Sequence, residues 1–228
     1  MSISSRFNRI KEELPATVRL IAVSKLHEAP AIREAYDAGQ RAFGESRVQE
    51  LLAKYEQLPP DIEWHFIGHL QVNKVKQIAP FIDTVQSVDS LKLLEKLNEQ
   101  AGKNRRRINV LLQVHIAREE HKFGFSFDEI EHLLESRIHE TFIHLNIKGL
   151  MGIATFTGDE KQIREEFAAL ARLFGKLKER YFAGKEDFKE LSIGMSDDYL
   201  LAIEEGSTMV RIGTKLFGER NYNYGNSI

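Results

Sequence analysis

One candidate for covalent chemistry is Lys25, the last residue of the apolar run at residues 18–25. A lysine amine that is partly removed from water has a lowered pKa, so more of it is present as the neutral nucleophile. A neutral amine attacks an aldehyde to form a Schiff base. Lys25 is therefore a candidate for holding a carbonyl compound, and the alternative is a solvated lysine that marks the end of a strand.

Two segments near the C-terminus contain groups that bind anions. The stretch Ser192-Ile-Gly-Met-Ser196 precedes a helical pattern, so Ser196 is predicted to be a helix N-cap with exposed amides beside it. Further along, Arg211-Ile-Gly-Thr214 offers a guanidinium, a glycine (Gly213) that permits close backbone approach, and the Thr214 hydroxyl. Together these segments predict a phosphate site; the alternative for each is ordinary turn chemistry and helix capping.

Histidines are the other candidates for chemistry, as metal ligands or as acid/base groups. His65 and His69 are four residues apart, a spacing that suits a metal pair on a helix. They fall in an apolar run that predicts a strand, where four residues span about 13 Å, so we expect no shared metal ion. His69 and His115 remain as titratable groups at strand ends.

The elements that must position these residues alternate along the whole chain. Eight apolar, β-branched or aromatic runs predict strands at residues 18–25, 42–45, 64–69, 84–88, 110–116, 147–154, 191–196 and 209–216. Helical patterns lie between them at residues 30–38, 45–58, 90–100, 126–136, 161–182 and 197–205. The seventh of these predicted strands ends at Ser196.

Eight strand-helix units in 228 residues give roughly 28 residues per unit, enough for a strand and a crossover helix. The sequence therefore predicts one domain, residues 1–228, folded as an α/β protein with a single (β/α)8 TIM-type barrel. An open doubly wound sheet is the alternative. In a barrel the active site lies at the carboxyl ends of the strands, and phosphate often binds after strands seven and eight. Lys25 and both anion-binding segments would lie at that end.

The composition excludes several functional classes. Lysine and arginine total 32 against 34 acidic residues, a net charge of -2, which gives no basic footprint for nucleic acid or an anionic membrane. There is no cysteine, so thiol catalysis, thiolate metal sites and disulfides are excluded. With neither a signal-peptide pattern nor an apolar run of about 20 residues, we expect a cytoplasmic protein. No apolar stripe demands a partner, so we expect a monomer.

Several motifs, found in the same order, resemble those of the pyridoxal phosphate homeostasis protein family. They are Leu20-Ile-Ala-Val-Ser-Lys25, Phe43-Gly-Glu-Ser-Arg-Val-Gln-Glu50, Trp64-His-Phe-Ile-Gly-His-Leu-Gln-Val-Asn-Lys74, Lys148-Gly-Leu-Met151, Gly194-Met-Ser196 and Arg211-Ile-Gly-Thr-Lys-Leu-Phe-Gly-Glu-Arg-Asn-Tyr222. The resemblance extends from about residue 18 to the C-terminus. A more remote resemblance is to the barrel domain of alanine racemase.

The resemblance implies a (β/α)8 barrel that carries pyridoxal 5′-phosphate as a Schiff base on Lys25. It also implies that Ser196, Gly213 and Thr214 bind the phosphate and that Arg211 faces the ring nitrogen. A cation beside the ring disfavours its protonation and so weakens the electron sink that most pyridoxal chemistry uses.

The chain departs from the family pattern at two places near the implied site. It has Ser46-Arg47 where the family often has Asn-Tyr, and His115 where the fifth strand often ends in Asn. These departures affect expected contacts with the cofactor ring, and they leave the lysine and the phosphate-binding residues unchanged.

The choice between enzyme and carrier depends on a second acid/base group, because racemisation needs one on each face of the bound amino acid. Lys25 could serve one face, and only His69 or His115 could serve the other. The chain ends at Ile228, soon after the eighth predicted strand, so we expect no room for the domain that completes alanine racemase. We therefore expect a carrier that buffers pyridoxal phosphate and delivers it to pyridoxal-dependent apo-enzymes. The alternatives are a low-activity amino-acid racemase and a phosphate-binding barrel enzyme without pyridoxal.

Overall fold

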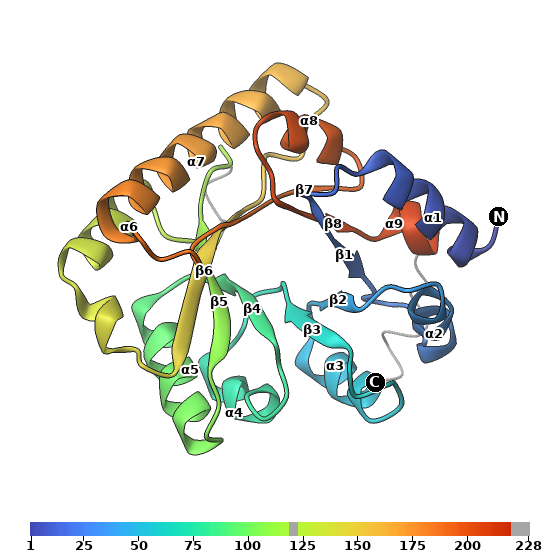
Figure 1. Ribbon diagram of the computed structural model, residues 1–228, viewed down its shortest axis with the longest axis horizontal. Coiled ribbons are helices and arrows are strands. Elements are labelled where there is room, and N and C mark those ends of the chain that lie inside the picture. The colour runs from blue at the N-terminus through green and yellow to red at the C-terminus, as the bar shows by residue number, and fades with distance from the viewer. Residues whose placement is uncertain (119–122, 220–228) are drawn as a thin grey trace.

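The structure, a computed structural model that describes residues 1–118 and 123–219, is built around eight parallel strands (Figure 1). Each strand is hydrogen-bonded to the next, and β8 pairs with β1, so the sheet closes into a barrel. The strands are β1 (Arg19–Val23), β2 (Ala42–Glu45), β3 (Glu63–Phe66), β4 (Thr84–Val88), β5 (Ile108–Val114), β6 (Leu145–Gly152), β7 (Glu190–Met195) and β8 (Met209–Ile212). The predicted (β/α)8 barrel is confirmed, and the open sheet is not found.

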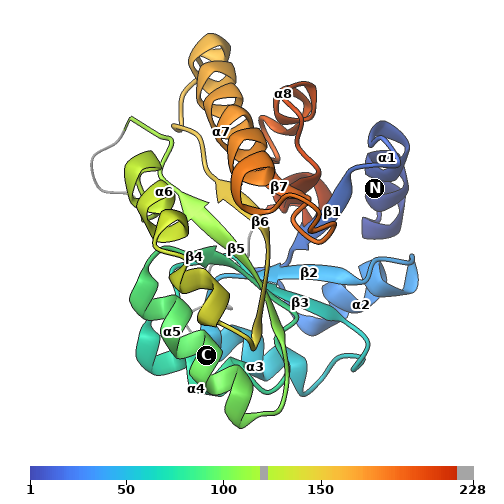
Figure 2. The ribbon, with the colours of Figure 1, turned by 60° about the vertical axis from the view of Figure 1, so that its left-hand side comes forward.

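Helices follow the strands and cover the outside of the barrel. They are α1 (Ile3–Glu13), α2 (Ala29–Asp37), α3 (Val48–Tyr55), α4 (Val75–Ile78), α5 (Leu91–Lys103), α6 (Phe127–Glu135), α7 (Glu160–Tyr181), α8 (Tyr199–Glu204) and α9 (Thr214–Phe217), with 3-10 turns η1 (Val72–Lys74) and η2 (Ile138–Thr141). Figure 2 shows α5, α6 and α7 along the outer surface of the strands. Because helices cover the strands outside and side chains fill the barrel inside, most strand residues are buried, which explains their nearly continuous apolar runs.

The inside and the outside of the barrel have separate apolar cores. Outside, the strands pack on the helices through residues such as Phe43 and Trp64. Inside, a small cluster fills the barrel with Ile21, Ala42, Leu111, Met151 and Met209. Buried polar side chains accompany this cluster, among them His65, Gln86, Ser192 and Arg211.

The first helix secures the seam where the chain closes on itself. Arg6 of α1 donates from Nε to the Leu216 carbonyl (2.6 Å) and from Nη2 to the Phe217 carbonyl (3.0 Å) of α9. Figure 1 shows α1 and α9 side by side beyond the β8–β1 pair. The N-terminal helix, absent from the helices expected from the sequence, therefore supports the last helix of the barrel.

Several strands and helices begin or end at other residues than the sequence predicts. The first strand ends at Val23, so Lys25 lies in the turn after it, and the eighth strand ends at Ile212, where the predicted strand continued into what is α9. The prediction that Ser196 caps a helix is wrong, because α8 starts at Tyr199 with Asp198 as its N-cap. The helix predicted to start at residue 45 starts at Val48.

The described part of the chain contains no helix with the length and hydropathy needed to cross a bilayer. This finding agrees with the absence of a long apolar run in the sequence.

Gly194 is required by the backbone at the end of β7. Its φ is +92°, and a Cβ there would lie 2.6 Å from the Ala202 Cβ of α8. We predict that Gly194→Ala lowers the free energy of unfolding by about 1–3 kcal/mol, since it adds both strain and overlap. Gly175→Ala, inside α7 where a Cβ would meet no atom within 4 Å, is the matched control and should be neutral or stabilising. Denaturant titration measures the free energy of unfolding of both variants. Equal stability of Gly194→Ala and Gly175→Ala would refute the claim that the backbone requires glycine at position 194.

Candidate functional site

The closure of the barrel brings the first strand and the last strand together at their carboxyl ends. Ala22 of β1 is the register partner of Ile212 of β8. One residue on, a Cβ on Gly213 would lie 3.2 Å from the Val23 carbonyl oxygen, so a side chain there would crowd the end of β1. Gly213 therefore lies beside the strand that leads into Lys25, which is partly buried.

The seventh strand joins this group through a hydroxyl. Ser196 Oγ accepts a hydrogen bond from the Gly213 backbone N–H (3.2 Å). The carboxylate of Asp198 accepts from the Met195 N–H (2.5 Å), which secures the turn after β7 without the Ser196 side chain. Ser196 is thus placed beside Gly213 by a contact between two loops, and not by capping α8.

The residues after Gly213 present unpaired donors. Thr214 is exposed and begins α9, and within the described part of the chain no acceptor is found for the backbone N–H of Thr214 or Lys215. Backbone N–H groups at the start of a helix, with a neighbouring hydroxyl, suit the oxygens of an anion. The geometry fits a phosphate group held by Thr214, with Ser196 and Gly213 at its edge.

Arg211 is buried inside the barrel mouth and held by three acceptors. Its Nη1 donates to the Ser192 carbonyl and Oγ (both 2.7 Å), and its Nη2 donates to the Gly152 carbonyl (2.9 Å). Burial lowers the pKa of Arg211 to about 10, against the opposing effect of Asp198, so the side chain stays charged at neutral pH. It is a fixed cation whose orientation is set by β6 and β7.

A chain of polar side chains continues from Arg211 into the barrel. Ser192 Oγ donates to Gln86 Oε1 (2.7 Å), and Gln86 Nε2 lies 3.0 Å from His65 Nδ1. Burial, with a smaller effect of Arg19, lowers the pKa of His65 to about 3, so the imidazole is neutral. Because the Gln86 amide donates, His65 Nδ1 accepts and its proton is on Nε2. No motif or spacing in the sequence indicates this network.

A second group that sequence reasoning missed is a buried ion cluster beneath the Lys25 turn. Lys54 of α3 is fully buried, and its Nζ donates to Glu45 Oε1 (2.7 Å) and to Glu50 Oε1 (2.6 Å). The i,i+4 spacing of Glu50 and Lys54 is visible in the sequence, but such pairs are usually on the surface. Nothing in the spacing shows that this pair is buried against Glu45.

The ion cluster holds the backbone on both sides of Lys25. Lys54 Nζ donates to the Ser24 carbonyl (2.8 Å), and Glu50 Oε1 accepts from the Leu26 N–H (2.5 Å). Leu26 has a φ of +64°, a left-handed conformation that is uncommon for leucine. The buried charges thus keep an unfavourable turn in place and fix the position of Lys25.

The cluster also contains a carboxyl group that titrates near neutral pH. Burial raises the pKa of Glu45 to about 7, with the charge of Lys54 opposing the effect and that of Glu50 adding to it. Ser24 Oγ donates to the same oxygen of Glu45 that Lys54 contacts (2.5 Å). Lys54 therefore stabilises the charged form only in part.

The two histidines considered for acid/base chemistry lie at other positions around the mouth. His69 follows β3, where its Nδ1 is 2.8 Å from Asp89 Oδ2 and its ring stacks on Phe123 with centroids 3.8 Å apart. His115 follows β5, and its backbone N–H donates to the Phe125 carbonyl (2.9 Å). Lys25 follows β1, which pairs with β8, the strand that leads into Gly213 and Thr214.

The closed eight-stranded barrel is the fold that alanine racemases share. Residues 1–221 match the family described as "Alanine racemase, N-terminal domain". Alanine racemase of Clostridium difficile 630 superposes with a TM-score of 0.75 at 15% identity, covering 97% of this chain and 57% of the racemase, which shows a shared fold.

Within that class the similarity to one group is much greater. The pyridoxal phosphate homeostasis protein of Haemophilus influenzae is 40% identical over 97% of this chain and 98% of its own length, and that of Escherichia coli K12 is 40% identical over 91% and 88%. The structure of PipY from Synechococcus elongatus PCC7942 with PLP bound has a TM-score of 0.86 at 38% identity, covering 95% of this chain and all of PipY. The chain belongs to the pyridoxal phosphate homeostasis protein family.

The raised pKa of Glu45 predicts a specific pH dependence. Between the ordinary value of 4.5 and about 7 the folded protein binds more protons at Glu45 than the unfolded chain does, so this contribution to stability falls as the pH rises. We predict that the free energy of unfolding of the wild type, measured relative to Glu45→Gln, decreases from pH 4.5 to pH 7.

His65 has the opposite effect, because its lowered pKa makes the wild type and Glu45→Gln alike more stable as the pH rises to 6.5. Subtracting the free energy of unfolding of Glu45→Gln from that of the wild type removes this effect. The exposed Glu56→Gln is the control and should show no such trend relative to wild type. Denaturant titrations across this range test the prediction, and a difference that does not change with pH contradicts the buried carboxyl assignment.

Proposed function

We propose that this chain binds pyridoxal 5′-phosphate at the carboxyl end of the barrel and acts in the homeostasis of that cofactor. The observation that carries the proposal is the meeting, at the β1–β8 seam, of the Lys25 turn with Ser196, Gly213 and the backbone donors of Thr214, which have no acceptor among the described residues. PipY, a relative at 38% identity, has been solved with PLP bound, which supports the same ligand here.

The residues present fit an aldehyde that carries a phosphate. Lys25 would hold the aldehyde carbon, and the Thr214 hydroxyl, the Thr214 and Lys215 amides and Ser196 would hold the phosphate oxygens. The bound cofactor would supply a ring that withdraws electrons from an attached amino acid. The Lys54 cluster fixes the backbone of Lys25 and so limits how far its amine can move.

Arg211 is the residue that we assign to the ring nitrogen. Three hydrogen bonds to Ser192 and Gly152 hold its guanidinium, and it remains charged at neutral pH. A fixed cation keeps a neighbouring ring nitrogen unprotonated, because two positive charges would repel each other at short range. An unprotonated ring withdraws electrons weakly, which suits binding more than catalysis.

We propose a carrier and not a robust racemase. Racemisation requires a second acid/base opposite Lys25. His69 is engaged by Asp89 and stacked on Phe123, so it is not available as that group. The proposed recipients are pyridoxal-dependent apo-enzymes, and we propose a monomer that acts in the cytoplasm.

Purification of the protein with bound cofactor tests the site. We predict a visible absorption band that borohydride reduction abolishes, and a reduced pyridoxyl label that peptide mapping places on Lys25. Lys25→Ala should lack both, and Lys176→Ala, a surface lysine paired with Glu131, is the matched control. A label on any other lysine would overturn the assignment.

The same preparation tests the phosphate-binding residues. Ser196→Ala and Thr214→Ala should each weaken retention of the cofactor by about 1–3 kcal/mol, because a charge-assisted hydrogen bond is lost. Thr17→Ala, at an exposed position before β1, should have no effect. Dialysis followed by absorption measures retention, and unchanged retention in both Ser196→Ala and Thr214→Ala counts against this part of the proposal.

The distinction between carrier and racemase has its own test. The protein with bound cofactor is incubated with single L-amino acids in deuterated water, and exchange at Cα is followed by NMR. We predict exchange no faster than with the free cofactor. Faster exchange that disappears in Lys25→Ala would show that the protein is an enzyme.

A further inference from the structure

The buried ion cluster of Lys54, Glu45 and Glu50 joins the turn that contains Lys25 to two other elements. Glu45 is the last residue of β2, and Glu50 and Lys54 belong to α3. The turn follows β1, which pairs with β2 in the barrel. None of the three charged residues is more than 2% exposed. Their charges are therefore removed from water directly beside the residue to which we assign the covalent bond.

The Lys54 ammonium is the centre of this cluster. Its Nζ donates to the Ser24 carbonyl (2.8 Å), to Glu45 Oε1 (2.7 Å) and to Glu50 Oε1 (2.6 Å). An ammonium group has three N–H bonds, so each of them can meet one of these acceptors. The acceptors come from the turn, from β2 and from α3, and one side chain thus fixes three segments relative to each other.

The turn that Lys54 holds is one that its own sequence disfavours. Leu26 has a φ of +64°, which leucine rarely adopts, and its N–H donates to Glu50 Oε1 (2.5 Å). Without these contacts Leu26 would relax toward an ordinary backbone conformation. The backbone on the C-terminal side of Lys25 would then rotate, and the amine would no longer be confined to one region.

The phosphate-binding residues are held by other contacts. Ser196 Oγ accepts from the Gly213 N–H (3.2 Å), which joins the loop after β7 to the end of β8. Arg6 of α1 donates to two carbonyls of α9, the helix that Thr214 begins. The two halves of the proposed cofactor site therefore have separate supports, and a substitution can disturb one without the other.

We propose that Lys54 is a positioning residue for the bond between Lys25 and the aldehyde, and that it does not contribute to phosphate binding. This inference rests on the function proposed above. The Lys25 amine condenses with an aldehyde by forming a carbon–nitrogen double bond, and the aldehyde oxygen leaves as water with two hydrogens of the amine. The extent of this reaction depends on how much of the time the amine is within reach of an aldehyde whose phosphate is already bound. Lys54 increases that fraction by keeping the turn in one conformation.

Two ligands separate the two halves of the site. Pyridoxal 5′-phosphate can bind through Lys25 and through its phosphate. In 4-deoxypyridoxine 5′-phosphate a methyl group replaces the aldehyde, so only the ring and the phosphate can bind. We predict that Lys54→Met lowers the affinity for pyridoxal 5′-phosphate about ten-fold or more and changes the affinity for the deoxy compound less than about two-fold. Calorimetry on protein freed of cofactor measures both affinities.

Glu50 offers a milder pair of variants, because Lys54 and Glu45 remain to balance each other's charge. Glu50→Ala removes the acceptor of the Leu26 N–H and should also weaken binding of pyridoxal 5′-phosphate alone. Glu50→Gln keeps a carbonyl oxygen at that place and should restore most of the affinity. Thermal unfolding of each variant without ligand shows that it is folded, and if Lys54→Met is not, the Glu50 pair decides the question.

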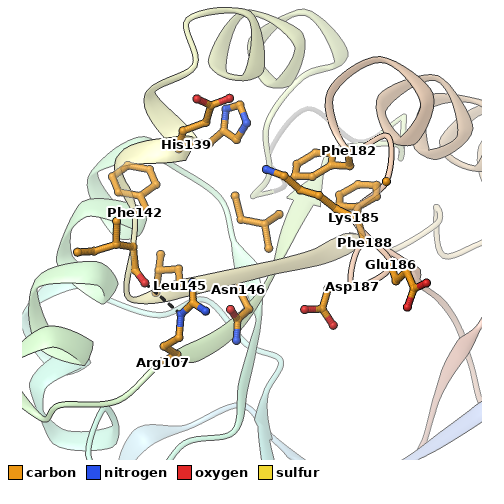
Figure 3. Close-up of a pocket in the computed structure, with 14 residues that line it drawn as sticks. Arg107, His139, Phe142, Leu145, Asn146, Phe182, Lys185, Glu186, Asp187 and Phe188 are labelled. Atoms are coloured by element: carbon orange, nitrogen blue, oxygen red, sulfur yellow. Dashed lines mark hydrogen bonds between the residues drawn. The ribbon is translucent and has the colours of Figure 1, made fainter.

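Lys185→Met is the control, because Lys185 lies at the opposite end of the barrel. Figure 3 shows it beside a cavity of about 670 Å³, which is formed where β5, β6 and β7 begin. This variant should bind both ligands as the wild type does.

Two results would overturn the inference about Lys54. One is unchanged affinity for pyridoxal 5′-phosphate in both Lys54→Met and Glu50→Ala, and the other is an equal loss of affinity for the two ligands. Lys25→Ala tests the proposed function separately, since it should bind the two ligands alike. If the wild type also binds them alike, the bond to Lys25 is itself refuted, and the inference about Lys54 is refuted with it.

Discussion

The hydrogen bonds between β1 and β8 are the contact on which the carboxyl-end site depends. Lys25 and Gly213 are far apart in the chain, and they become neighbours only because the last strand pairs with the first. Arg6 adds two hydrogen bonds from α1 to the helix that follows β8, so the seam is held on its outer side as well. The site therefore forms only when the whole barrel has closed.

Buried charge is the second constraint, and it is located where the function is proposed. Lys54, Glu45 and Glu50 are removed from water behind β1 and β2, and Arg211 is removed from water inside the mouth. Such groups destabilise a fold unless every charge has partners. Here the partners include the carbonyl of Ser24, the N–H of Leu26 and the carbonyl of Gly152. The hydrogen bonds that stabilise the buried charges therefore also hold the backbone around the site.

The barrel was predictable because strands covered on both faces leave continuous apolar runs, and all eight observed strands overlap predicted ones. Their ends were less predictable, since Thr214 and its neighbours continue the pattern of β8 but form a helix. The predicted role of Ser196 as a cap was wrong because Asp198 is the N-cap, and a choice between nearby polar residues depends on tertiary contacts. The buried Lys54 cluster was missed because its burial comes from distant segments, and no local pattern records it.

The fixed turn around Lys25 bears on how a carrier can work. Leu26 is kept in its left-handed conformation by groups of the protein itself, so the shape of this turn does not depend on an occupant. A preorganised receptor loses little conformational entropy at each cycle of uptake and release. Turnover of the cargo would then be governed by making and breaking one covalent bond, with the scaffold unchanged between loaded and unloaded forms.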